Sequence, residues 1–475
     1  SSDVCSSDLH GEEDLASDVK LQAAKDAADS GHYDKAWPII NQALFEEPDD
    51  PKFLTLASFI YEKQGHVGAA YQVAKRLTTM HPNNPAAWLN LGKCADTLWR
   101  MDEAEAAYRR ALNQVKAGDD ETKGLIFNNL AAMYLQLGEF DKARSASEKA
   151  LKIDPYHLKA RHNMGLCHLA AGEWKEGWKL YEASIGSPHR IAWNYTGEPA
   201  WRGEPGGTVV IFGEQGIGDE VCAASMIPDA IKRAGKVIID CDARLANLFQ
   251  RSFPDARIYG TRSAKVLNWA EEDQKVDYSI PAMQVGALFR EKAEDFPGTP
   301  YLKADPDRVL MWKALWASKG KPTIGIAWTG GIKETAAMYR RWNHDEMAQI
   351  MRTVPAKWVS LQYKDAAAEL AEFKAKYPDI DLVQYPATLA RDYDETAALF
   401  ASLDAVVAMQ STAVHVAGAL GVPCVAGIPK TSQWRYGSTG DSLPWYSCVK
   451  LVRQKRLGHW ELEGIQQWLR QSRFS

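Results

Sequence analysis

The sequence predicts two kinds of structure in one chain: an α-helical repeat array followed by α/β domains with parallel sheets. A 34-residue period in the first 190 residues predicts the array. Short apolar runs that alternate with helical stretches after Trp201 predict the sheets. With 475 residues, the chain has room for two or three domains with sizeable cores.

The composition is that of a globular protein. A net charge of -5 argues against binding to bulk nucleic acid. No apolar run approaches the roughly 18 to 20 residues of a membrane-spanning helix. The seven cysteines are scattered singly, which predicts neither a disulfide framework nor a zinc site, and no metal is expected. We therefore expect a soluble, cytoplasmic protein, and set residues 1–16 aside as a leader that begins with a processing or expression scar, SSDVCSSDL.

Small residues recur at one position of the period. Ala36, Ala70 and Ala104 are 34 residues apart, Ala143 follows 39 residues later and Gly177 another 34. Small side chains let paired helices approach closely, while glycine turns the chain between them and proline ends the second helix. About five helical hairpins are therefore expected over residues 17–190.

Three segments resemble tetratricopeptide repeats: WLNLGKCADTL (Trp88–Leu98), NNLAAMYLQLGEFDKA (Asn128–Ala143) and EKALKIDP (Glu148–Pro155). The resemblance implies a superhelix with a groove that binds protein or peptide. It also implies that Asn128, Asn129 and Asn163 line that groove and bind peptide backbone. The alternatives are ordinary solvated asparagines and a structural or dimerising role for the repeats, so a homo-oligomer is possible.

The remainder of the chain divides into two predicted α/β domains, residues 200–305 and 306–475. The first has candidate strands at Thr208–Phe212, Val237–Cys241, Arg257–Tyr259 and Val276–Ile280. The second has candidate strands at Thr323–Trp328, Trp358–Gln362, Leu382–Tyr385, Ala405–Ala408, Cys424–Ile428 and Leu451–Arg453, a helix from Thr412 and a closing helix, Trp460–Arg470. A ligand cleft is expected at the carboxyl ends of both sheets.

The first loop of interest is GEQGIGDE, Gly213–Glu220, which follows a strand and precedes a helix. Its backbone N–H groups could meet an anion or a hydroxylated ligand. It lacks the Gly-Lys-Ser/Thr ending of a phosphate-binding P-loop and the order GxGxxG, although Asp240 is placed like the ribose-binding acid of a dinucleotide fold. Asp219 is either an ordinary acid at a helix N-terminus or a general base.

The second loop of interest is MQSTAVHVAGALGVP, Met409–Pro423. Its hydroxyls, Ser411 and Thr412, and the imidazole of His415 suit a diphosphate that is bound without a metal. The alternative is an ordinary N-cap with a core histidine. The loop after the strand at residues 323–328 adds Trp328, Lys333, Arg340 and Arg341, whose cations could stabilise a leaving phosphate or simply be solvated.

Taken together, GEQGIGDE, IGIAWTGG, WVSLQYKD, the loop from Met409 and SQWRYG resemble the glycosyltransferase half of bacterial tetratricopeptide-repeat proteins, which is similar to the ADP-heptose heptosyltransferases. The resemblance implies a GT-B fold of two Rossmann-like domains, with residues 200–305 on the acceptor side and residues 306–475 binding a nucleotide sugar. It implies inverting transfer without metal or cofactor, and Asp219 as the catalytic base. The implied nucleotide-sugar site comprises Gln215, Gly216, Gly218, Trp328, Lys333, Arg340, Arg341, Gln362, Gln410, Ser411, Thr412 and His415.

One residue departs from that pattern, because heptosyltransferases usually carry Asp where this chain has Gln410. An amide cannot replace the charge of a carboxylate, so the donor could differ or bind more weakly. The expected function is transfer of a sugar from a nucleotide sugar to an acceptor hydroxyl, such as one on a protein recruited by the repeats. The alternative is a non-catalytic scaffold with a degenerate glycosyltransferase-like domain. An epimerase or dehydrogenase, a third possibility, would need a GxGxxG loop or a helix with Tyr-x-x-x-Lys.

Overall fold

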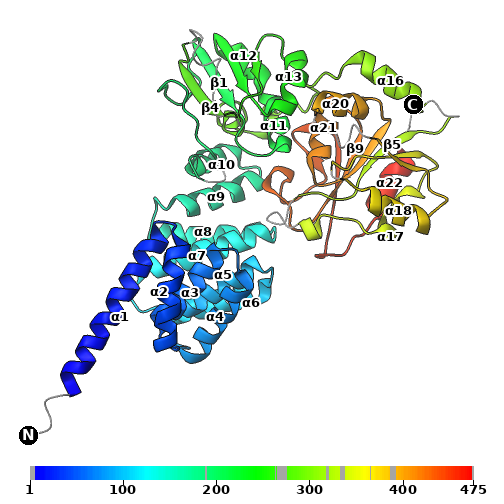
Figure 1. Ribbon diagram of the computed structural model, residues 1–475. Coiled ribbons are helices and arrows are strands. Elements are labelled where there is room, and N and C mark those ends of the chain that lie inside the picture. The colour runs from blue at the N-terminus through cyan, green and yellow to red at the C-terminus, as the bar shows by residue number, and fades with distance from the viewer. Residues whose placement is uncertain are drawn as a thin grey trace, which may run out of the picture. The chain divides into compact units, whose positions relative to one another are not determined.

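The computed structural model describes residues 6–187, 190–262, 264, 275–316, 320–331, 337–363, 365–385 and 392–472 (Figure 1). The chain divides into two compact units. The repeat unit comprises Ser1–Tyr134 and Lys142–Ala160, and the sheet unit comprises Leu135–Asp141 and Arg161–Ser475.

The repeat unit is built of antiparallel helical hairpins. Its helices are α1 (Ser6–Asp29), α2 (Tyr33–Glu46), α3 (Pro51–Lys63), α4 (Val67–Met80), α5 (Pro85–Thr97), α6 (Met101–Gln114), α7 (Asp120–Gln136) and α8 (Phe140–Ile153), of which the last two extend across the boundary of the units. The recurring alanines lie on the even-numbered helices and are completely buried. Helix starts also repeat, because Asp50 and Asn84 each cap a helix that has proline at its first position. The predicted helical hairpins are thus confirmed.

The turn inside each hairpin needs a left-handed residue. Gly31, Gly65 and Gly138 have φ angles of 75°, 82° and 69°. In the third hairpin the same position is Trp99, the non-glycine residue with positive φ in the described chain, at 59°. A side chain in this conformation costs about 1–2 kcal/mol. The turn therefore keeps its positive φ angle at this position of the repeat even where the residue is not glycine.

Two glycines of the second hairpin allow a matched test of this requirement. Gly65→Ala should lower the free energy of unfolding by about 1 kcal/mol, because its φ of 82° is strained for any side chain. Gly68→Ala should raise it by about 0.5–1 kcal/mol, because Gly68 lies in α4 with open space around it. Chemical denaturation followed by circular dichroism measures both. Equal effects of the two substitutions would contradict this account of the turn.

The first sheet of the sheet unit is parallel and four-stranded. Its strands are β1 (Thr208–Phe212), β2 (Lys236–Asp240), β3 (Arg257–Tyr259) and β4 (Tyr278–Pro281), in the order β3-β2-β1-β4. Alternate residues of β1 point to opposite faces, so Val209 and Ile211 join the main core while Val210 packs with Tyr195 and Tyr259. The main-core face carries α11 (Ile217–Ala223), α12 (Ile227–Arg233) and α13 (Ala246–Ser252), and α15 (Gly286–Phe289) follows β4.

The second sheet is mixed and seven-stranded, in the order β10-β11-β9-β8-β5-β6-β7. Its strands are β5 (Thr323–Ala327), β6 (Lys357–Ser360), β7 (Leu382–Gln384), β8 (Ala405–Met409), β9 (Cys424–Ile428), β10 (Ser442–Leu443) and β11 (Tyr446–Arg453). All pairs are parallel except β10 with β11. The sequence did not predict β10, and it predicted only the end of β11.

Helices cover both faces of the second sheet (Figure 1). One face packs on α17 (His344–Met351), α18 (Ala367–Lys376) and α22 (Glu463–Gln471). The other packs on α20 (Tyr393–Ala401) and α21 (Thr412–Leu420), with α16 (Pro306–Trp316) against α20. Strands covered on both faces are fully buried, as β5, β8 and β9 are.

The last hairpin of the period, α9 (Leu158–Ala170) and α10 (Trp174–Tyr181), belongs to the sheet unit although its sequence continues the repeats. Trp174 lies 4.6 Å from Phe296 between ring centroids, and Trp178 Nε1 donates a 2.8 Å hydrogen bond to the carbonyl of Arg290. A Cβ at Gly286 would lie 2.4 Å from the Trp178 ring, so only glycine fits there. This aromatic packing makes the hairpin part of the first sheet's core.

Candidate functional site

Buried charges fix the loop between β1 and α11. Arg190 and Glu214 form a two-bond ion pair of 2.7 and 2.9 Å, with only 1% and 2% of their side chains exposed. The Arg190 guanidinium also lies 3.8 Å from the ring centroid of Tyr181, whose hydroxyl is 3.4 Å from Gln215 Oε1. Breaking a buried pair of this kind costs about 3–5 kcal/mol, so the loop is held firmly.

Asp219 has two partners in this arrangement. Its Oδ2 accepts the backbone N–H of Gly216 at 2.9 Å, which caps the start of α11. Its Oδ1 lies 2.6 Å from a guanidinium nitrogen of Arg435, which also donates to Gln215 at 2.9 Å. Arg435 follows β9, so this ion pair joins the loops of the two sheets. A base at this position would have to release Arg435 in order to accept a proton.

The loop between β8 and α21 carries buried groups without partners. Gln410 is 1% exposed, and neither its amide oxygen nor its amide nitrogen has a hydrogen-bond partner among the described residues. Ser411 Oγ is likewise buried and unpaired within the described structure. Gly330 allows this approach, because a Cβ there would lie 2.3 Å from the Gln410 carbonyl oxygen. Buried polar groups normally pair, so these groups are available to bind a ligand.

Arg340 is the buried cation beside them. It is 5% exposed, its Nε has no partner, and its guanidinium forms no ion pair in the described part of the chain. Burial lowers the pKa of Arg340 to about 10. Its neighbour Arg341 is exposed and lies 3.5 Å from Glu369. Of the two arginines, the structure therefore places only Arg340 in the site.

These groups line a cavity of about 500 Å³, which we call the cleft. It is lined by Gly216, Ile217, Gly218, Asp219, Arg244, Gly331, Arg340, Tyr363, Tyr393, Gln410, Ser411, Thr412, His415, Gln433 and Tyr436. A second cavity of about 240 Å³ shares Arg244, Tyr363, Tyr393, Ser411 and Thr412 with it and adds Gln362 beside Thr329. The cleft thus collects eight of the residues named from sequence, namely Gly216, Gly218, Asp219, Arg340, Gln410, Ser411, Thr412 and His415.

Other named residues lie elsewhere. Gln215 supports Arg435, Trp328 is completely buried, and Lys333 lies outside the described residues. Asn128 is buried on α7 and donates to Asn129 at 3.5 Å. Asn163 is buried on α9.

Sequence reasoning missed several residues around the cleft. Arg435 and Tyr436 belong to the SQWRYG segment, in which one cation among aromatic residues was the available signal. Arg244 pairs with Asp242 and reaches the cleft from a turn after β2. Tyr446 and Lys450 have the Tyr-x-x-x-Lys spacing of the third hypothesis, but both lie on strand β11 rather than on a helix.

His415 differs from the expected anion ligand. Burial lowers its pKa to about 4, with a further contribution from the nearby Arg435 cation. The imidazole is therefore neutral at neutral pH. Its Nδ1 lies 3.2 Å from the Tyr446 hydroxyl, and its Nε2 lies 3.0 Å from the Tyr436 hydroxyl.

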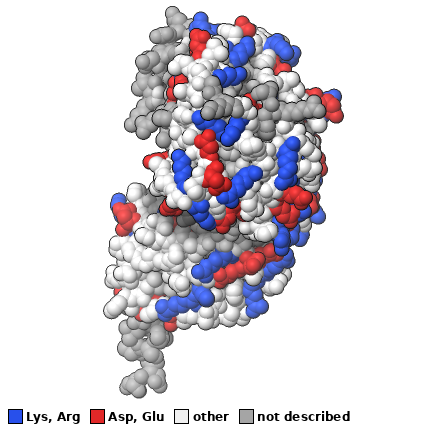
Figure 2. All heavy atoms as spheres, turned by 90° about the vertical axis from the view of Figure 1, so that its right-hand side faces the viewer, with Lys and Arg blue, Asp and Glu red and all other residues white. Residues whose placement is uncertain are grey.

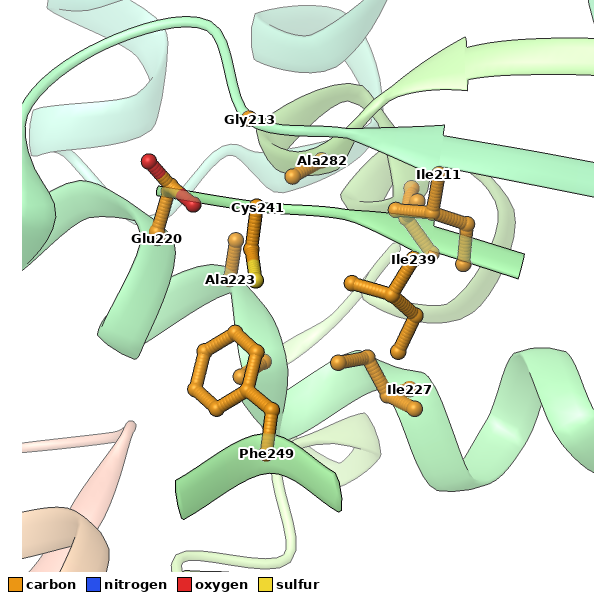
Figure 3. Close-up of a pocket in the computed structure, with 11 residues that line it drawn as sticks. Ile211, Gly213, Glu220, Ala223, Ile227, Ile239, Cys241, Phe249 and Ala282 are labelled. Atoms are coloured by element: carbon orange, nitrogen blue, oxygen red, sulfur yellow. The ribbon is translucent and has the colours of Figure 1, made fainter. Parts of the chain in front are cut away.

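Glu220 lies on α11 beside a small cavity of about 10 Å³ (Figure 3). In Figure 3 its carboxylate points away from Phe249, toward the side on which Gly213 lies. Its carboxylate accepts the backbone N–H of Asp242 at 2.9 Å and pairs with Arg262 at 2.5 Å. Burial nevertheless raises the pKa of Glu220 to about 7, against the opposing effect of Arg262.

Three further observations concern surface charge, metal ligands and membrane spans. Acidic and basic side chains are interspersed on the face shown in Figure 2, so that face offers no large field of one sign. Within the described ranges, no group of three or more His, Cys, Asp or Glu residues is placed to hold a metal ion. None of the described helices is long and apolar enough to cross a membrane.

A tetratricopeptide repeat family model matches residues 84–155. Protein FlbA of Caulobacter vibrioides is 27% identical over 434 residues, which cover 87% of this chain and 71% of FlbA. Tetratricopeptide repeat protein 8 of Caenorhabditis elegans is 22% identical over 153 residues, 32% of this chain and 30% of that protein. The human intraflagellar transport protein 88 homolog is 26% identical over 121 residues, 26% of this chain and 14% of its own.

Solved structures of repeat proteins are similar to parts of this chain. The tetratricopeptide-repeat protein TTC0263 of Thermus thermophilus is 22% identical, with a TM-score of 0.32, and covers 35% of this chain and 90% of its own. Pseudomonas aeruginosa pilF is 18% identical, with a TM-score of 0.33, and covers 36% of this chain and 75% of its own. The family match at residues 84–155 shows tetratricopeptide repeats in the N-terminal part of the chain, which is followed by a part with two sheets.

The buried carboxyl of Glu220 predicts a specific pH dependence of stability. Because its pKa is about 7 when folded against an ordinary 4.5, the folded state holds a proton that the unfolded state has released over this range. Stability should fall as pH rises, by about 2 kcal/mol between pH 5 and pH 8. Glu220→Gln has no carboxyl group to titrate, so its free energy of unfolding should not fall in this way. Relative to wild type, the variant should therefore become more stable by the same amount between pH 5 and pH 8. Urea denaturation at the two pH values measures it, and a constant difference would show that Glu220 is not the titrating group.

Proposed function

We propose that this chain is a protein-binding scaffold of the tetratricopeptide type. The proposal is supported by the repeat match and by relatives that share the repeats. Stacked helical hairpins form extended surfaces that suit a bound polypeptide.

A column of asparagines supports an extended peptide as the ligand. Asn90 and Asn129 each precede the recurring small residue of their hairpin by 14 positions. They therefore occupy equivalent sites on α5 and α7, the first helices of two successive hairpins of the repeat unit. The amide nitrogens of Asn90 and Asn129 have no hydrogen-bond partner among the described residues. An amide both donates and accepts, which matches the alternating groups of a peptide backbone.

Removal of the two unpaired amides tests this role. Peptides selected on the full chain from a random display library should bind Asn90→Ala/Asn129→Ala at least tenfold more weakly, a loss of about 1.4 kcal/mol. The matched control is Asn113→Ala, an exposed asparagine on α6, the second helix of its hairpin. Isothermal titration calorimetry measures all three proteins. Equal affinities of the double variant and the control would exclude the asparagine column.

We propose as a second function that the cleft binds a nucleotide sugar and transfers its sugar, as in a GT-B glycosyltransferase. The observation that carries this proposal is the set of buried, unpaired groups around the cleft: Arg340, Gln410 and Ser411. A guanidinium, an amide and a hydroxyl beside the N-terminus of α21 form a site for a phosphate group. Leaving a charge buried and unpaired is costly, so a bound anion would recover that cost.

The reaction would use the groups that face the cleft. Asp219 would leave Arg435 and take the proton of an acceptor hydroxyl, whose oxygen would form a bond to the anomeric carbon. The bond between that carbon and the phosphate oxygen would break with inversion. The nucleoside diphosphate would leave with the bonding electrons, held by Arg340 and the start of α21.

Adjacent arginines provide the test of the anion site. Arg340→Ala should weaken binding of nucleoside diphosphates at least tenfold, because it removes the cation without a protein partner. Arg341→Ala should change binding less than twofold, because Arg341 is exposed and pairs with Glu369. Calorimetry with ADP, UDP, GDP and CDP measures both variants. If wild type binds none of the four, the scaffold function stands alone.

The variant Asp219→Asn distinguishes sugar transfer from nucleotide binding. This change leaves Arg435 without its carboxylate partner and makes the cleft more positive. Affinity for the nucleoside diphosphate should therefore stay the same or rise, while sugar transfer is lost. Transfer that survives at the wild-type rate would exclude Asp219 as the base.

A further inference from the structure

A chain of hydrogen-bonded groups runs from the protein interior to the cleft. The Tyr301 hydroxyl donates to the Val221 carbonyl at 2.6 Å and lies 3.2 Å from the Tyr446 hydroxyl. The Tyr446 hydroxyl lies 3.2 Å from His415 Nδ1, and His415 Nε2 lies 3.0 Å from the Tyr436 hydroxyl. His415 and Tyr436 line the cleft, whereas Tyr301 and Tyr446 do not.

Counting protons fixes the direction of each bond. Tyr301 has given its proton to Val221, so the proton between Tyr301 and Tyr446 must come from Tyr446. Tyr446 then has no proton for His415, and Nδ1 must carry one and donate it to Tyr446. The neutral imidazole has a single N–H, so Nε2 is bare and accepts the proton of Tyr436. Every contact in the chain then has exactly one hydrogen, and the opposite tautomer leaves the contact between the two buried tyrosines without one.

The Cys222 thiol is a further hydrogen-bond neighbour of the Tyr446 hydroxyl. Burial raises the pKa of Cys222 and keeps it a neutral thiol, and the count requires that this S–H donate to the second lone pair of the Tyr446 oxygen. The low pKa of His415, about 4, agrees with a neutral ring at neutral pH.

We propose that Tyr436 is a fixed hydrogen-bond acceptor in the cleft, which selects a ligand with a hydroxyl group and excludes phosphate oxygens from its position. Its only proton is committed to His415, so the phenolic oxygen can offer the ligand lone pairs and nothing else. Arg340, Gln410 and Ser411 provide donors for an anion elsewhere in the same cleft. The proposal rests on the ligand binding proposed above and adds to it: the favoured ligand carries both an anionic group and sugar hydroxyls, with the hydroxyl end at Tyr436.

The proton count is tested without any ligand. In full-length protein with ¹⁵N-labelled histidine, the His415 resonances should show a protonated Nδ1 and a bare Nε2 at neutral pH. Tyr446→Phe removes the acceptor of Nδ1–H from a position outside the cleft. The variant should therefore show the opposite tautomer, with Nε2–H donating to Tyr436. A protonated Nε2 in wild type would overturn the proposal.

Ligand selection is tested with UDP and UDP-glucose, or with the equivalent pair for whichever base binds. Tyr436→Phe should weaken the sugar nucleotide about three- to tenfold and leave the diphosphate within twofold, the effect of one lost hydrogen bond. Tyr156→Phe, an exposed tyrosine outside the cleft, is the matched control and should not change the ratio of the two affinities. Tyr446→Phe should raise the affinity for UDP relative to that for UDP-glucose, because the Tyr436 hydroxyl then has a proton to donate.

The outcomes distinguish this proposal from the proposed nucleotide binding on which it rests. Tyr436→Phe could bind both nucleotides with the same ratio of affinities as wild type. That result would overturn the role of Tyr436 and leave the proposed anion site intact. Absence of binding to every nucleoside diphosphate and sugar nucleotide overturns both proposals, even if the tautomer is as expected. A changed ratio together with the expected tautomer supports the fixed acceptor.

Discussion

The arrangement of the sheet unit depends on a row of charges that are buried in pairs. Arg190 neutralises Glu214 inside the protein, and Arg435 neutralises Asp219 one step further along the same loop. Gln215 lies between the two pairs, in contact with Tyr181 and Arg435. The buried charges of Arg190 and Glu214 are stabilised because each lies within hydrogen-bonding distance of the other, and Asp219, 28% exposed, carries the row to the cleft. The loop after β1 therefore has one position, which is set by α10 on one side and by the segment after β9 on the other.

This row explains why the last repeat hairpin belongs with the sheets. Tyr181, at the end of α10, contacts both the Arg190 guanidinium and the Gln215 amide. Trp174 and Trp178 extend the contact as apolar packing on Phe296 and the backbone at Arg290. A hairpin in the middle of an array buries its face on the next hairpin. Here the neighbouring surface is the first sheet's core, so the last hairpin and the cleft loop share one set of contacts.

The sequence was informative wherever a position must satisfy a geometric requirement that few residue types can meet. The recurring alanines and turn glycines predicted the hairpins, and apolar runs located β1, β3 and β9 at their observed bounds. Trp99 shows the limit, because the turn conformation persists there without glycine. The edge strand β10 has two residues and no apolar run to reveal it.

The site was less predictable for a similar reason. Arg340 and Arg341 are identical residues in adjacent positions, and only the packing decides that the first is buried and the second solvated. The contribution of His415 depended on Tyr436 and Tyr446, which lie 21 and 31 residues away in sequence. Loops that follow strands in a parallel sheet were correctly expected to converge. No short motif indicates which side chains of these loops find a compensating charge in the folded structure.

The contrast between paired and unpaired charges also bears on whether the cleft binds a ligand or the domain is kept only for its shape. A domain kept only for its shape gains nothing from a buried guanidinium without a partner, and an apolar residue at Arg340 would avoid the desolvation cost. Glu214, Asp219 and Asp242 each have a cationic partner. In the described structure, Arg340 has no ion-pair partner, and the side-chain polar atoms of Gln410 and Ser411 have no hydrogen-bond partner. Because Arg340, Gln410 and Ser411 line one cavity, a single ligand there could offset the cost of all three. The binding site that we propose in the cleft would offset this cost, whether or not the bound molecule reacts there.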